Sequence, residues 1–161
     1  MSKRTAGEDN NALSADFLDF IVCLNKCSVD FVLVGGYALG VHGVVRATGD
    51  IDFFYRRTKA VVRRLCEAME HFGAPPEVID EASLLTPQIV TQFGKPPYRI
   101  DLLNEIDGVS FDEVWAGATS TTIQGQQIRV IGLKELRANK TATGRKKDAD
   151  DVRKLGARKK R

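Results

Sequence analysis

VLVGGYAL at residues 32–39 and DIDFFY at residues 50–55 are the two segments that most constrain how this chain folds. The first stretch is an apolar run that ends at Gly35 and Gly36, so it predicts a buried strand, a sharp turn and a helix. Glycine lets the backbone approach a phosphate closely, and a helix N-terminus attracts anions. No G-K-[ST] follows the two glycines, so the missing P-loop lysine pattern disfavours a GTPase- or kinase-like enzyme. The third glycine of a dinucleotide-binding fingerprint is misplaced as well.

The second stretch carries two carboxylates. In a strand, Asp50 and Asp52 point to the same side, with their backbones about 7 Å apart. Two anions this close repel each other unless a cation lies between them, and a hard divalent ion such as Mg²⁺ suits oxygen ligands. A third acid, Asp101, lies in the otherwise apolar run at residues 98–103, where it is costly unless it is paired or bound to metal. If the two strands are neighbours, the three acids form a cluster that can hold two metal ions.

Hydrophobic periodicity predicts alternating helices and strands in the rest of the chain. Ser14 and Thr58 are expected to cap the first and third helices. Helices are expected at residues 15–27, 37–43, 58–71, 110–116, 133–142 and 147–155, and strands at 29–34, 50–55, 89–94 and 98–106, with a hairpin at 119–131 that turns at Gln124 and Gly125. Because several strands come as hairpins, the sequence predicts an α/β fold with a mixed sheet flanked by helices. We expect one minimal domain at residues 13–156, a flexible tail at 1–12 and a basic tail at 157–161.

The composition is that of a soluble globular protein, with 161 residues, 43% hydrophobic and 28% charged. The net charge of +3 does not by itself indicate a nucleic-acid partner. Its distribution is uneven, since residues 145–161 hold nine Lys or Arg and three Asp, while the preceding part is net acidic. This asymmetry suits an RNA backbone near the active site, and a solubilising tail is the alternative. No signal peptide or membrane-length apolar run is visible, so we expect a cytoplasmic protein without a membrane partner.

The cysteines and histidines predict no metal centre. Three cysteines, Cys23, Cys27 and Cys66, are too few for a disulfide framework. Cys23 and Cys27 share a helical face and are expected to be small buried thiols. His42 and His71 show no ligand-like spacing, so a structural or surface role is expected for each.

The order of the motifs resembles the polymerase-β-like nucleotidyltransferase superfamily. The hGG turn is Val34-Gly35-Gly36, and after a 13-residue gap comes Asp50-Ile51-Asp52-Phe53 as the Dh[DE]h strand. Arg46-x-Thr48-x-Asp50-Ile51-Asp52 is similar to the R-x-T-x-D-[IL]-D form of its bacterial branches. The resemblance also implies a third strand acid, which matches Asp101.

The C-terminal part resembles a block found in abortive-infection AbiEii-type toxins and small relatives. It reads Lys140-x₄-Arg145-x-Lys147-Asp148-x-x-Asp151 here. In that family these bases face the nucleotide phosphates. The resemblance therefore implies nucleotide binding by the residues Gly35, Gly36, Arg46, Thr48, Lys140, Arg145 and Lys147. Asp148 is expected to pair with a neighbouring base, and a role as a functional acid is the alternative. AbiEii proteins are usually larger, and this chain matches only their core.

The resemblance implies a nucleotidyltransferase-like fold and a metal-dependent enzyme. It would use Mg²⁺ or Mn²⁺ to transfer a nucleoside monophosphate from an NTP to a hydroxyl acceptor. Asp50 and Asp52 would hold the metal, and Asp101 would complete the cluster and help to deprotonate the acceptor. The acceptor is expected to be tRNA, as for related toxins with an antitoxin partner, or else an aminoglycoside-type small molecule or a protein side chain. The alternative is a catalytically silent module that binds RNA or protein through its basic end.

Overall fold

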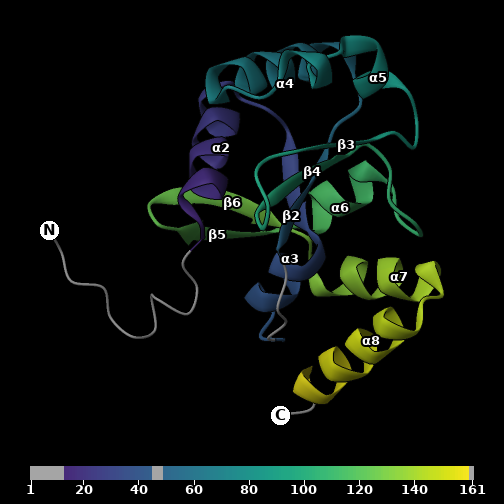
Figure 1. The fold of residues 1–161 in the computed structure, drawn as a ribbon. Coiled ribbons are helices and arrows are strands. Elements are labelled where there is room, and N and C mark those ends of the chain that lie inside the picture. The colour runs from purple at the N-terminus through teal and green to yellow at the C-terminus, as the bar shows by residue number, and fades with distance from the viewer. Residues whose placement is uncertain (1–12, 45–48, 160–161) are drawn as a thin grey trace, which may run out of the picture.

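The computed structural model describes residues 13–44 and 49–159 of the chain. These residues form one small domain, in which helices flank a six-stranded mixed sheet (Figure 1). The strands are β1 (Phe31–Val34), β2 (Asp50–Tyr55), β3 (Val90–Phe93), β4 (Arg99–Leu103), β5 (Thr119–Ile123) and β6 (Gln126–Val130). The helices are α2 (Ala15–Lys26), α3 (Gly35–Val41), α4 (Lys59–Phe72), α5 (Glu81–Leu85), α6 (Phe111–Gly117), α7 (Leu133–Thr143) and α8 (Lys146–Lys159), with a 3₁₀ turn at Pro76–Val78.

The sheet has the strand order β3-β4-β2-β1-β6-β5. Strand β2 is parallel to β4 and antiparallel to β1, and β1 is parallel to β6. The outer pairs β3–β4 and β5–β6 are antiparallel. Gln124 and Gly125, at the tip of the β5–β6 hairpin, both have positive φ, as a tight primed turn requires. The predicted mixed sheet and hairpin are therefore confirmed.

Aromatic side chains fill the core between the sheet and helices α2 and α4. The ring of Phe20 on α2 lies 5.7 Å from that of Phe53, 5.2 Å from Phe72 and 5.4 Å from Phe93, measured between centroids. All four residues of β1 are buried, which is typical of a central strand covered on both faces. This packing makes the sheet a rigid support for the side chains at the ends of β1, β2 and β4.

Local capping follows the sequence closely. The Ser14 hydroxyl accepts a hydrogen bond from the Phe17 amide, and the Thr58 hydroxyl accepts one from the Val61 amide, so both predicted caps are confirmed. A capping box between Ser110 and Glu113 starts α6.

Some details differ from the sequence expectations. Helix α3 begins at Gly35, two residues earlier than expected, so both glycines lie in its first turn. Helix α8 continues to Lys159, beyond the expected end at residue 155. The expectation that Cys23 and Cys27 are buried holds only in part, because both side chains pack against the core but stay partly exposed.

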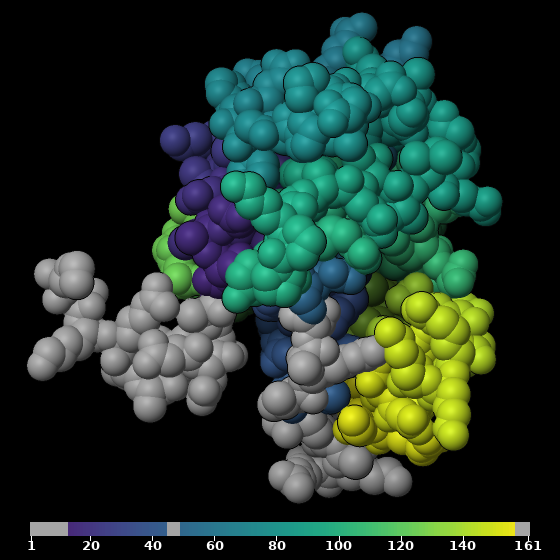
Figure 2. Space-filling view, in the orientation of Figure 1, coloured from purple at the N-terminus to yellow at the C-terminus, as the bar shows by residue number. Residues whose placement is uncertain are grey.

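Helices α7 and α8 lie on the opposite side of the molecule from α4 and α5 (Figure 1). In the space-filling view, these two helices appear in yellow-green and yellow, below the teal surface of α4 and the neighbouring segments (Figure 2). No helix among the described residues is both long and apolar enough to cross a membrane.

Candidate active site

Three carboxylates meet on neighbouring parallel strands. Strand β2 pairs with β4 in a register that sets Asp52 directly opposite Asp101. Residues opposite each other on adjacent parallel strands point to the same face, about 4.8 Å apart at the backbone. Asp50 lies two residues before Asp52 and therefore faces the same side. The condition that the sequence left open, that the two acidic strands are neighbours, is met.

The glycine turn lies directly beside this cluster. Gly35 has a φ of +73°, a conformation that side-chain-bearing residues rarely adopt. A Cβ atom at Gly35 would also overlap with the carboxylate of Asp52. Both the backbone conformation and the close approach therefore require glycine here. As a result, the backbone of the turn lies next to the Asp52 carboxylate without an intervening side chain.

The cluster is electrostatically strained in its ionised form. Burial, together with the charges of Asp101 and Asp50, raises the pKa of Asp52 from 3.8 to about 7, while Lys140 acts in the opposite direction. A carboxylate whose pKa is raised in this way is stabilised when a cation approaches it. The same arrangement is common where a protein uses acids for binding or catalysis.

Arg99 supplies one such positive charge. Its Nε donates to Asp101 Oδ1 at 2.8 Å, and its Nη2 donates to Asp50 Oδ2 at 2.8 Å. The sequence reasoning missed this residue. The signal was present, because Arg99 lies two positions before Asp101 in β4 and therefore faces the same side of the sheet.

A cleft of about 480 Å³ opens over the carboxylates. The sheet side of the cleft contributes the glycine turn and the three acids, and the opposite wall comes from α7 and the start of α8. Of the predicted site residues, the cleft is lined by Gly35, Gly36, Asp50, Asp52, Asp101, Lys140, Arg145 and Lys147. It is also lined by residues that the sequence reasoning did not single out, Arg99, Glu105, Asp107, Asn139 and Thr143. Arg46 and Thr48 lie outside the described residues.

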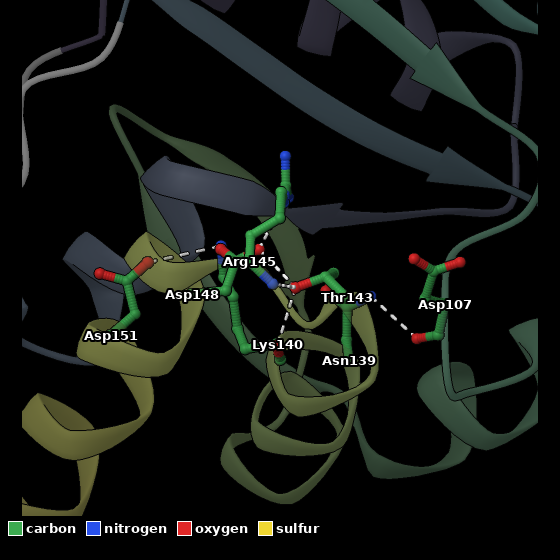
Figure 3. Close-up of polar contacts among 7 residues, drawn as sticks. All are labelled: Asp107, Asn139, Lys140, Thr143, Arg145, Asp148 and Asp151. Carbon is green, nitrogen blue, oxygen red and sulfur yellow. Dashed lines mark hydrogen bonds and ion pairs between the residues drawn. The ribbon is translucent and has the colours of Figure 1, made fainter.

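A buried network organises the α7–α8 wall (Figure 3). The ammonium of Lys140 donates to Asp148 Oδ1 at 2.9 Å and lies 3.6 Å from Asp151 Oδ2. The other oxygen of Asp148 accepts from Thr143 Oγ1 at 2.6 Å and from Arg145 Nε at 2.7 Å. Burial alone would raise the pKa of Asp148, but the hydrogen bonds from Thr143 and Lys140 and the charge of Lys140 lower it to about 2. The expectation that Asp148 pairs with a neighbouring base is confirmed.

The environment of Lys140 differs from the sequence expectation. The sequence predicts a lysine whose ammonium meets phosphates, whereas the structure shows a buried side chain held between two aspartates. The side chain of Arg145 is 61% exposed beside the same cleft. The wall therefore combines a buried positive charge with basic groups that face the solvent.

The mixed sheet and the glycine turn that leads into α3 form a nucleotidyltransferase-like α/β fold, with the three strand acids at its cleft. Residues 14–161 match the family described as "Nucleotidyl transferase of unknown function (DUF2204)", which covers most of the chain. The chain belongs to this family and is a nucleotidyltransferase.

Solved structures of other proteins share this fold. The lincosamide antibiotic adenylyltransferase LnuA, solved with lincomycin bound, matches with a TM-score of 0.60 at 15% identity, over 91% of this chain and 98% of LnuA. TM1012 of Thermotoga maritima, a candidate nucleotidyltransferase, matches with a TM-score of 0.58 at 12% identity, over 88% of this chain and 91% of TM1012. No curated protein sequence matches the chain. At these identities the likeness concerns the fold.

Proposed function

We propose that the protein transfers a nucleoside monophosphate from an NTP to a hydroxyl acceptor in the cytoplasm, with the help of a divalent ion. The observation that carries this proposal is the register of β2 and β4, which sets Asp52 opposite Asp101 beside the Gly35 turn. Asp50 completes a face of three carboxylates at the base of the cleft.

The donor set fits Mg²⁺ or Mn²⁺. All three acids offer carboxylate oxygens, which are the ligands that hard divalent ions prefer. Burial and the neighbouring acids raise the pKa of Asp52, because three ionised carboxylates this close repel one another. A bound cation would relieve this repulsion and stabilise the ionised cluster. Asp50, Asp52 and Asp101 would hold the ion, which when bound would polarise the reacting phosphate.

The residues of the chain then have distinct tasks in the transfer. The acceptor oxygen forms a bond to the α-phosphorus while the bond from that phosphorus to the pyrophosphate oxygen breaks, and pyrophosphate leaves with the electron pair. The hydroxyl proton passes to a carboxylate oxygen of Asp101. The backbone amides of Gly35 and Gly36 hold phosphate oxygens beside the acids that would bind the ion, because neither glycine carries a side chain of its own.

The basic residues stabilise the negative charge that develops on the leaving group. Arg145 and Lys147 line the cleft and contact the triphosphate directly. The ammonium of Lys140, which is held by Asp148 and Asp151, contributes its positive charge without direct contact. The roles of Arg46 and Thr48 in nucleotide binding remain predictions.

Two acceptor classes are consistent with the fold. LnuA is a lincosamide adenylyltransferase of similar extent, which favours a hydroxyl group on a small molecule. The exposed bases of α8 favour tRNA, as expected from the resemblance to AbiEii-type toxins. The AbiEii-type assignment, the toxin role and an antitoxin partner remain predictions. Co-purification of a partner protein with the chain from its native host tests the antitoxin prediction.

The test is transfer of label from each α-labelled NTP in the presence of Mg²⁺. Separate reactions contain total tRNA or a panel of small hydroxyl acceptors that includes lincosamides and aminoglycosides. We expect labelled acceptor with the wild type and none with Asp52→Asn. Labelling that persists in the Asp50→Ala, Asp52→Ala double variant would refute the mechanism. RNA binding that survives these substitutions, without any transfer, would favour the silent binding module instead.

A further inference from the structure

A second group of metal-binding side chains lies outside the cleft. It consists of Cys27 at the end of α2 and of Glu67 and His71 on α4. One potential ligand atom from each residue lies within 4.8 Å of the other two. None of the three residues lines the active-site cleft. Cys27 precedes the start of β1, whereas the Gly35 turn follows the end of that strand.

The local structure brings these three groups together. Glu67 and His71 are one helical turn apart on α4, so they lie on the same face of the helix. Cys27 is the C-cap residue of α2, and α2 packs against α4 through the contact of Phe20 with Phe72. The ligand set is thus formed by two packed helices rather than by one flexible loop.

The distances suit a small tetrahedral ion. Glu67 Oε1 lies 3.7 Å from His71 Nε2. Two ligand atoms bound to one tetrahedral zinc ion are about 3.3–3.8 Å apart, given zinc bond lengths of about 2.0–2.3 Å. Glu67 and His71 are exposed and free to rotate toward Cys27, so the remaining separation needs only a small side-chain adjustment.

We propose that Cys27, Glu67 and His71 bind one zinc-type divalent ion, which fastens the end of α2 to α4. A thiolate, a carboxylate and an imidazole are three ligands that zinc takes in proteins, with a fourth position open to water. A carboxylate cluster of the kind in the cleft selects hard ions, whereas a thiolate and an imidazole select softer ones. The two sites therefore take different metals. This proposal does not depend on the proposed function.

An ordinary surface ion pair between Glu67 and His71 is the simpler account, but it leaves Cys27 without a role. An exposed pair of this kind contributes little to stability. The Cys27 sulfur lies within 4.8 Å of a Glu67 carboxylate oxygen, and burial and then the charge of Glu67 raise the pKa of the Cys27 thiol. A bound cation would offset this unfavourable proximity.

Cobalt is the probe, because a thiolate bound to Co²⁺ gives a charge-transfer band in the near ultraviolet and carboxylates do not. The full chain, reduced and freed of metal by chelation, is titrated with Co²⁺. We expect the band with the wild type and with Cys66→Ser, the control, because Cys66 lies on α4 beside Glu67 but is not one of the three ligands. We expect no band with Cys27→Ser, and binding weakened about tenfold or more with His71→Gln. Excess Zn²⁺ should remove the band, and excess Mg²⁺ should not.

Further control experiments distinguish binding at this site from binding in the cleft and from the effects of misfolding. The Asp50→Asn, Asp52→Asn double variant should keep the cobalt band, since it alters only the cleft. Zn²⁺ should raise the melting temperature of the wild type and of Cys66→Ser, and leave that of Cys27→Ser unchanged. Far-ultraviolet circular dichroism without metal checks that each variant is folded. Absence of the band in the wild type, its persistence in Cys27→Ser, or an equal zinc-dependent rise in melting temperature in Cys27→Ser would overturn the proposal.

Discussion

Gly35 shows how strongly a single residue can constrain this site. Its positive φ and its closeness to Asp52 each exclude a side chain. Gly40, in the same helix, has open space around the position of a Cβ and an ordinary backbone conformation. The two glycines therefore form a matched pair for substitution.

We expect Gly35→Ala to destabilise the protein by about 1–3 kcal/mol, from backbone strain and from displacement of the Asp52 carboxylate. Gly40→Ala should be neutral or slightly stabilising, because alanine favours a helix more than glycine does. Urea unfolding of the two variants beside the wild type measures the difference. Equal stability of the two variants would contradict the requirement for glycine at residue 35.

Asp52 provides a prediction on pH. Its pKa is raised in the folded state from 3.8 to about 7, so the folded protein holds this proton to higher pH than the unfolded chain does. Ionisation of Asp52 therefore lowers stability progressively as the pH rises through this window, and the loss is complete above about pH 7. In the presence of a chelator, Asp52→Asn should be more stable than the wild type by up to about 4 kcal/mol at about pH 8.

The advantage of Asp52→Asn should vanish at about pH 4, where the wild-type carboxyl is protonated in the folded state. Urea unfolding at both pH values is the measurement. An advantage that does not change with pH would show that burial and neighbouring charges do not strain this carboxylate.

At the scale of elements, helices α7 and α8 depend on Asp148. This fully buried carboxylate bonds to Lys140 and Thr143 on α7 and to Arg145 between the helices. Because its pKa is lowered to about 2, its contribution to stability is present above the ordinary value of 3.8 and is lost as the pH falls toward 2.

We expect Asp148→Asn to destabilise the protein by about 3 kcal/mol near neutral pH, since it leaves a buried ammonium with a weakened partner. Asp150→Asn is the matched control, because Asp150 is partly exposed on α8 and pairs with Arg153, outside the buried network. The control should change stability by less than about 1 kcal/mol. Urea unfolding gives both values, and hydrogen exchange should show faster exchange in α8 of Asp148→Asn. Equal losses in the two variants would argue against the network as the link between α7 and α8.

At the scale of the whole molecule, the cleft joins two parts of the chain that are far apart in sequence. Its floor comes from β2, β4 and the glycine turn, and its opposite wall comes from α7 and the start of α8. A nucleotide that touches both sides would hold them together and stabilise the folded state by mass action.

We therefore expect an NTP with Mg²⁺ to stabilise the wild type by about 2.7 kcal/mol at about 100 times its dissociation constant. The nucleoside alone, without phosphates, should have a much smaller effect. The Asp50→Asn, Asp52→Asn double variant should lose the stabilisation by NTP and Mg²⁺. Thermal unfolding across an NTP titration measures this, and equal stabilisation of wild type and double variant would place the nucleotide elsewhere.

The local features of this protein can be read from its amino-acid sequence. The alternation of β2 sets Asp50 and Asp52 on one side, the apolar run before Gly35 makes a buried strand, and Ser14 and Thr58 start their helices. These features follow from backbone geometry and from hydrogen bonds between residues close in the chain. The order of the motifs was also enough to indicate a nucleotidyltransferase.

The contacts between distant residues come from tertiary packing. The parallel pairing of β2 with β4 brings Asp101 beside Asp52 and lets Arg99 donate hydrogen bonds to both Asp50 and Asp101. The packing of α8 on α7 buries Lys140 against Asp148, and the packing of α2 on α4 brings Cys27 to His71. Pairings of this kind depend on how the whole chain buries its apolar surface, and no local period in the sequence encodes them.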